Sequence, residues 1–136
     1  MRIVAAALLV LTLAACAQTS GFAPTAPASY LTGTSWRRID DANANPHGAT
    51  MAFTADRASG YTGCNDWFAS VTHNGEALRF GSVGTTRRAC DGAGVQIDTE
   101  RSFLAVIEAT RYAHYDQDAL MLLDENQRVI AEFRTE

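Results

Sequence analysis

The sequence contains no lysine and no apolar run long enough to cross a bilayer as a helix. A transmembrane helix needs about 20 apolar residues, whereas the apolar stretch at residues 3–15 is shorter and polar residues follow soon after it. Because lysine is absent, all eleven basic residues are arginine, and with fifteen acidic residues the net charge is −4. This acidic balance argues against a nucleic-acid partner and against electrostatic binding to anionic lipid.

Signatures of catalytic and metal sites are also missing. No cysteines have the Cys-x-x-Cys spacing that redox enzymes favour, and no serine lies in a Gly-x-Ser-x-Gly elbow. His47, His73 and His114 are scattered, without metal-ligand spacing. The glycine-rich residues 81–86 lack the Gly-Lys-Ser/Thr ending of a phosphate loop. The sequence therefore predicts a protein that is not an enzyme, with no catalytic residues, no metal and no cofactor.

The most informative positive feature is Leu-Ala-Ala-Cys at residues 13–16, which ends the apolar N-terminal run. Arg2 precedes the run, so the pattern is that of a secretory signal that ends in a bacterial lipobox. We expect residues 1–15 to be a lipoprotein signal peptide and Cys16 to carry the lipid that anchors the protein to a membrane. Ala17 replaces the Asp that signals inner-membrane retention. This favours the outer membrane, with the protein facing the periplasm.

Two further segments follow the expected signal peptide. Residues 16–29 comprise the lipidated cysteine and a small, proline-containing, uncharged stretch, which is the composition of a flexible tether. Residues 30–136 have the length of a single domain. The domain contains the remaining cysteines, Cys64 and Cys90. Because the periplasm is oxidising, we expect them to form a disulfide, which would stabilise the fold by about 3.5 kcal/mol. A redox-active pair is the less favoured alternative.

The pattern of apolar residues in the domain predicts short strands around one helix. Asn74-Gly75 favours a type I′ hairpin turn. A helix is expected over residues 96–109, with Asp98 as its N-cap, because one face at helical spacing collects Thr99, Phe103, Val106, Ile107 and Thr110. This mainly β pattern suits a small antiparallel barrel with one α-helix. The expected strands lie at residues 34–39, 51–54, 61–64, 67–72, 77–83, 112–115, 120–123 and 129–133.

Several segments of the domain occur in an order that resembles the META domain, also called the HslJ-like family. Residues 31–36 (LTGTSW) open it and residues 120–124 (LMLLD) lie near its end. The most specific segments are Gly63-Cys64-Asn65 and, further on, Thr86 followed by Ala89 and Cys90. The family usually has Met at the position of Arg88. The resemblance covers residues 30–136, essentially the whole domain.

This resemblance implies a small, β-rich, barrel-like fold with a helix, in a bacterial envelope protein linked to heat-shock response and novobiocin tolerance. It implies no known reaction. We therefore expect a monomeric, non-enzymatic outer-membrane lipoprotein that contributes to stress or antibiotic tolerance by binding an unknown protein or a small hydrophobic ligand. Two alternatives stay open. One is a periplasmic carrier with an aromatic-lined cavity of about 300 Å³ or more. The other is an inhibitor or interaction module for a periplasmic enzyme, marked by an exposed apolar patch.

Overall fold

The computed structural model describes residues 30–41, 48–90 and 94–136. The expected signal peptide, Cys16, the tether and His47 lie outside these residues. The described part contains one helix and nine strands. In chain order they are β1 (Ser35–Arg38), β2 (Thr50–Phe53), β3 (Arg57–Tyr61), β4 (Asp66–Asn74), β5 (Ala77–Phe80), β6 (Gly84–Thr85), α1 (Val95–Ala109), β7 (Tyr112–Asp116), β8 (Ala119–Leu123) and β9 (Val129–Thr135).

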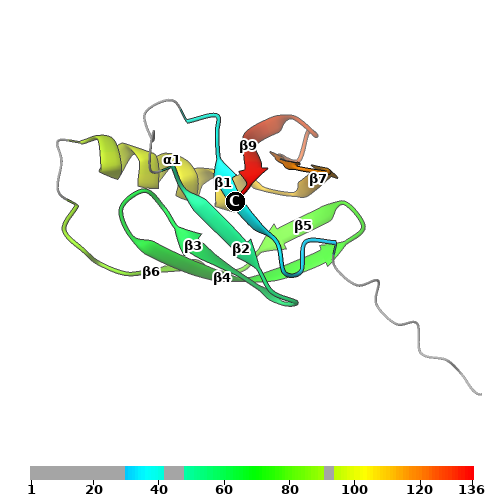
Figure 1. Cartoon of the computed structure of the whole chain (residues 1–136), viewed down its shortest axis with the longest axis horizontal. Helices are drawn as coiled ribbons and strands as arrows, with labels where there is room; N and C mark the ends of the chain where they lie inside the picture. Colours follow the sequence, from blue (N-terminus) through cyan, green and yellow to red (C-terminus); the bar gives the residue numbers. More distant parts are fainter. Residues whose placement is uncertain (1–29, 42–47, 91–93) are drawn as a thin grey trace, which may run out of the picture.

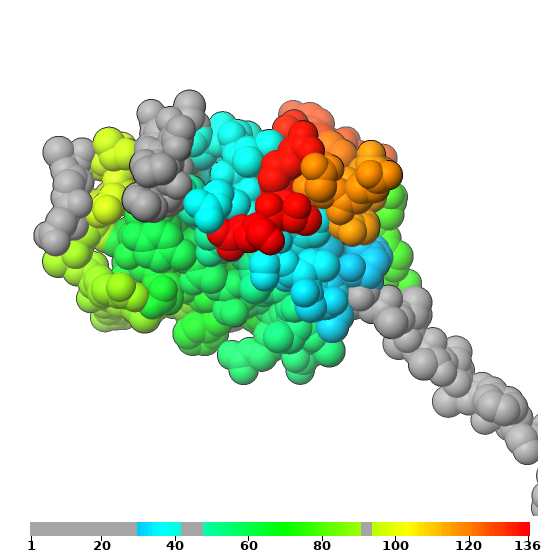
Figure 2. Space-filling view, in the orientation of Figure 1, coloured from blue at the N-terminus to red at the C-terminus, as the bar shows by residue number. Residues whose placement is uncertain are grey.

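Eight of the strands form a closed antiparallel barrel, as the sequence predicted (Figure 1). The order around the barrel is β3-β2-β1-β9-β8-β7-β5-β4, and β4 pairs with β3 to close it. Figure 2 shows the C-terminal residues lying on the surface between the first strand and β7. The weakest seam lies between β5 and β7, where only Ala77 and Tyr112 pair. The barrel wall therefore opens beyond this point.

Strands β5 and β6 follow the same edge of β4 and form one strand that a bulge interrupts. Phe80 pairs with Val71 before the bulge, whereas Gly84 pairs with Phe68 after it. The N–H of Gly81 still donates to the Ser70 carbonyl at 2.9 Å. The β5–β6 segment thus holds one residue more than β4 across this step, which is the count of a β-bulge. The predicted continuous strand at residues 77–83 is wrong for this reason.

The prediction of a strand at residues 61–64 is also wrong. The strand is β3, which ends at Tyr61, and residues 62–65 make the turn into β4. Gly60 lies in this strand, although glycine is more typical of turns than of strands. A Cβ atom there would be 2.2 Å from the Thr50 carbonyl oxygen, so this glycine permits a close approach of two backbones. The turn itself depends on Gly63, whose φ is +107°.

The predicted helix is confirmed, with its start one residue earlier at Val95. Its N-cap is Gly94 and no side chain caps it, so the prediction of Asp98 as N-cap is wrong. Asp98 lies in the first turn, where a carboxylate still interacts favourably with the helix dipole. The face predicted to pack inward is buried as expected, and it consists of Thr99, Phe103, Val106, Ile107 and Thr110.

Side chains from the strands and from α1 fill the barrel interior. Trp36, Trp67, Phe103 and Phe133 are at most 1% exposed. The ring of Phe103 packs edge-on against Trp67, with ring centroids 5.1 Å apart, and this contact fixes α1 against the barrel. All members of the buried hydrophobic core lie within residues 31–133. The core and the closed sheet of the described residues therefore lie in the same part of the chain, between residues 31 and 135.

Candidate binding groove and the polar cluster beside it

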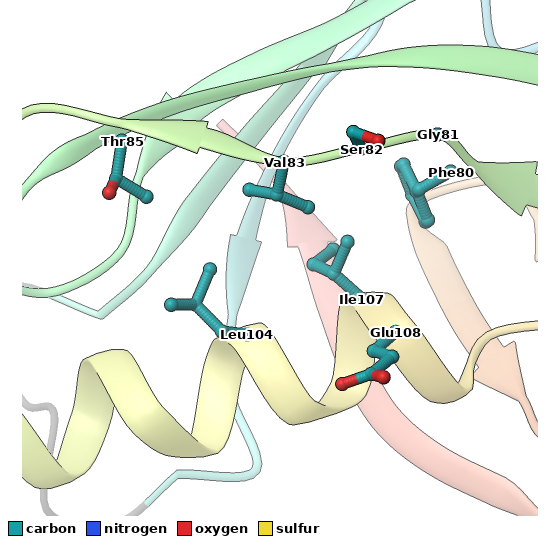
Figure 3. A pocket seen from close by; sticks show the side chains of 8 residues that line it. All are labelled: Phe80, Gly81, Ser82, Val83, Thr85, Leu104, Ile107 and Glu108. Carbon is teal, nitrogen blue, oxygen red and sulfur yellow. The ribbon is translucent and has the colours of Figure 1, made fainter.

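A groove of about 420 Å³ lies where the barrel wall opens, between α1 and the β5–β6 segment (Figure 3). Beyond Ala77, the β5–β6 segment has no neighbouring strand on its edge away from β4, and α1 takes that position instead. One wall consists of residues 80–83 and Thr85, and the other of Leu104, Ile107 and Glu108. The open seam and the bulge together create this space.

The groove has a lining of mixed character, in which three aliphatic side chains face one another. Val83 points from the strand segment toward α1, and Leu104 and Ile107 point back toward it (Figure 3). Ile107 is 1% exposed and forms part of the core, whereas Val83 is 37% exposed at the mouth. Glu108 is the charged residue among those that line the groove. This arrangement can hold a small apolar molecule and has one charge with which to orient it.

The backbone of Phe80 adds unpaired polar groups to the groove side of the barrel. The N–H of Val71, the partner of Phe80 on β4, donates to the Asp56 carbonyl on the opposite side at 2.8 Å. Val71 and Phe80 are therefore a non-hydrogen-bonded pair, in which the N–H and C=O of Phe80 point away from β4. These groups face the opening where another strand would normally pair.

Residues of the family motif take part in a polar cluster, which holds the chain just after β6 in place. Asn65, which is 6% exposed, donates from Nδ2 to Glu100 Oε2 at 3.0 Å. Its Oδ1 accepts hydrogen bonds from Thr86 Oγ1 at 3.0 Å and from the Arg88 backbone N–H at 2.7 Å. Thr62 Oγ1 also donates to Glu100, at 2.6 Å. Asn65 therefore connects the β3–β4 turn, α1 and the chain after β6.

A disulfide between Cys64 and Cys90 lies beside this cluster, with Cα atoms 5.6 Å apart, an ordinary separation for a disulfide. Cys64 is buried, and the Nδ2 atom of Asn65 lies 3.2 Å from its sulfur. Gly63 packs on α1, where a Cβ atom would be 2.4 Å from Thr99 Cγ2. Ala89, the remaining motif residue, is exposed. All these contacts are structural, and none assembles a nucleophile with a base.

Glu100 is a structural member of this cluster whose hydrogen-bond partners the sequence did not predict. In the structure, its carboxylate accepts the hydrogen bonds of Thr62 and Asn65 from another element. An acidic residue next to Thr99 on the inward face of the helix was the available signal. Arg88, two residues before Cys90, forms an ion pair with Asp66.

The described histidines lie apart from the groove. Nδ1 of His114 is 3.0 Å from Glu76 Oε1 on an exposed part of β7, an ordinary cross-strand contact. His73 lies on β4 opposite Leu78. Nearby, Tyr30 donates to the Ala113 carbonyl at 3.1 Å, and its pKa is raised by burial and, secondarily, by Glu76. Within residues 30–41, 48–90 and 94–136, no group of three or more His, Cys, Asp or Glu side chains could hold a metal ion.

A turn near the C-terminus contains the most strongly perturbed carboxylate. Asp124 accepts hydrogen bonds from the Arg128 side chain at 2.9 Å, and from the backbone N–H groups of Arg128 and Asn126 at 3.0 and 2.8 Å. The Arg128 side chain lowers the pKa of Asp124 most, and the two backbone donors act in the same direction. This residue stabilises the β8–β9 turn.

In the part of the chain that the structure describes, no helix combines the length and apolar character needed to cross a membrane.

The closed barrel, its single packed helix and the lateral groove define a small β-barrel protein. The META domain model matches residues 29–136. The chain therefore belongs to the META domain family. Neither this family nor the structural neighbours point to catalysis. No curated protein is significantly similar in sequence.

Solved structures share the fold at low sequence identity. A protein from Burkholderia xenovorans, determined by NMR, is 23% identical, with a TM-score of 0.60 over 78% of this chain and 83% of that one. A second NMR structure is 13% identical, with a TM-score of 0.58 over 76% and 90%. A DUF4847 family protein from Bacteroides vulgatus is 14% identical, with a TM-score of 0.56 over 77% and 94%. At these identities, the likeness concerns the fold.

Proposed function

We propose that this protein is an outer-membrane lipoprotein that acts by binding a small apolar ligand in the groove between α1 and the β5–β6 segment. Its contribution to envelope stress or antibiotic tolerance would follow from this binding. The groove itself carries the proposal, because it is a space of about 420 Å³ with aliphatic side chains on both walls, beside a filled barrel interior. The lipobox at Cys16 and the membership in the META domain family support the setting.

The proposal therefore includes the carrier alternative, but the ligand would bind in this groove on the barrel wall instead of in an aromatic-lined cavity. The volume exceeds the roughly 300 Å³ at which small-molecule sites begin. The expected aromatic lining is wrong for this groove, since Phe80 is the one aromatic residue that lines it. The buried core takes Trp36, Phe53, Trp67, Phe103 and Phe133. A site on the barrel wall leaves that core intact.

A direct test measures binding of the neutral fluorescent probe N-phenyl-1-naphthylamine to residues 29–136. Val83→Asn places a polar group at the groove mouth, and we expect it to weaken probe binding at least fivefold. Val129→Asn is the matched control, because Val129 is 47% exposed and does not line the groove. Thermal unfolding checks that both variants are folded. Absence of binding to the wild-type domain, or equal loss in both variants, would refute the proposal.

A further inference from the structure

We infer that the groove selects cationic amphiphiles, molecules with a hydrocarbon body and a protonated amine. This inference rests on the proposed function and adds the chemical class of the ligand. Its basis is Glu108, the charged residue that lines the groove. The hydrocarbon would lie between Val83 and the pair Leu104 and Ile107, and the ammonium would bind the Glu108 carboxylate.

The carboxylate of Glu108 is available for such a ligand. Among the residues that the structure describes, eight ion pairs are formed and none contains Glu108. The neighbouring cation, Arg111, donates from Nη1 to the backbone carbonyls of Glu108 and Thr110, both at 2.8 Å. Arg111 therefore binds main-chain carbonyl groups and not the Glu108 carboxylate. Glu108 is left as a charged acceptor beside an apolar surface.

Glu108 is the next-to-last residue of α1, and the last turn contains no basic residue. The guanidinium of Arg111, just after the helix, donates to the carbonyls of Glu108 and Thr110 and so compensates the partial negative charge of the helix end. The preference for a cation therefore comes from the Glu108 carboxylate alone, which would repel a carboxylate ligand.

The helix offers an apolar contact one turn away from the charge. Leu104 and Glu108 lie four positions apart, so they are neighbours on the surface of α1, separated by about 5.4 Å along the helix axis. Ile107, which precedes Glu108, is turned toward the core. On the opposite wall, Ser82 lies at the Glu108 end of the groove and Thr85 at the other end (Figure 3), so Ser82 is the hydroxyl placed to accept a hydrogen bond from an ammonium near Glu108.

Three eight-carbon probes test the inference by isothermal titration calorimetry with residues 29–136 at pH 7, namely octylamine, 1-octanol and octanoate. We expect octylamine to bind at least fivefold more tightly than 1-octanol, and octanoate to bind more weakly than either. Glu108→Gln should remove the advantage of octylamine over 1-octanol, whereas Glu108→Asp should retain most of that advantage. Glu132→Gln, on the exposed side of β9, is the matched control and should behave as wild type.

The outcomes separate this inference from the proposed function. Binding of 1-octanol with no preference for octylamine overturns the ligand class and keeps the groove. A preference for octylamine that survives in Glu108→Gln also overturns the inference, because the selectivity then arises elsewhere. If no probe binds, both the inference and the proposed function fail.

Discussion

Replacing Asn65 by alanine should destabilise the domain by about 3 kcal/mol. Its amide makes one hydrogen bond to the Glu100 carboxylate and accepts two others, from Thr86 and from the Arg88 backbone. A neutral hydrogen bond contributes about 1 kcal/mol and one to a charged group about 1.5–3 kcal/mol. The expected loss is smaller than the sum of these three contributions, because Thr86 and Arg88 are exposed and can bond to water instead. We therefore expect the bond to Glu100 and the burial of Asn65 to dominate.

Urea unfolding of oxidised residues 29–136, followed by tryptophan fluorescence, measures this loss. Asn126→Ala is the control, because the hydrogen bond of Asn126 to Asp124 uses its backbone N–H. We expect that control to change the free energy of unfolding by less than about 0.5 kcal/mol, as is usual for surface substitutions. A loss below 1 kcal/mol for Asn65→Ala would refute the idea that this amide holds the three segments together.

A second substitution tests the charge of the same cluster. Asn65→Asp keeps the shape of the side chain but places a second carboxylate beside Glu100. Like charges at this distance repel unless one of them binds a proton. We therefore expect the difference in unfolding free energy between this variant and wild type to shrink as the pH is lowered from 7 to 5. A difference that is constant over this range would show that packing, rather than charge, causes the loss.

Three other predictions follow from the same structure and sequence. Replacing both Cys64 and Cys90 by serine should lower the free energy of unfolding by about 3.5 kcal/mol, and dithiothreitol should have a similar effect on the wild-type domain but none on the variant. Because the folded-state pKa of Asp124 is lowered, its stabilising effect is present above the usual carboxyl range and is lost as the pH falls through the lowered value. Asp124→Asn should therefore be less stable at pH 7 and should lose less stability than wild type on acidification, as thermal unfolding at several pH values would show. Finally, Cys16→Ser in the full chain should move the protein out of the outer-membrane fraction, and an unchanged fractionation would contradict the lipid anchor.

The sequence predicted the parts of the fold that depend on local periodicity. The helix follows from the 3.6-residue spacing of Phe103, Val106 and Ile107, which no strand can reproduce. The hairpin at Gly75 follows from turn chemistry, and the φ of Gly75 is +58°. The predicted type I′ turn is wrong, because that type needs a positive φ at both central residues and neither Asn74 nor Glu76 has one. Strand β3 was missed because Gly60 is a turn residue by composition. Glycine is required at this position because the backbone of β2 lies against it. That contact joins residues apart in the sequence and is visible only in three dimensions.

The binding groove was beyond sequence analysis for a similar reason. It depends on a strand pairing that stops after Ala77 and on a bulge that shifts the register against β4. Neither leaves a local pattern in the sequence. The aromatic residues were visible, but their number does not distinguish a core from a cavity lining. The structure uses Trp36, Trp67 and Phe103 to fill the barrel.

The bulge between β5 and β6 makes the groove depend on a single inserted residue. Deleting Ser82 would restore the register against β4, join β5 to β6 in one regular strand and draw Val83 out of its position at the mouth. The barrel, the helix and the disulfide cluster would be untouched by that deletion. A relative with the same fold can therefore gain or lose this groove through one codon, so the length of the segment between Gly81 and Gly84 is a better guide to whether a relative has the groove than overall similarity.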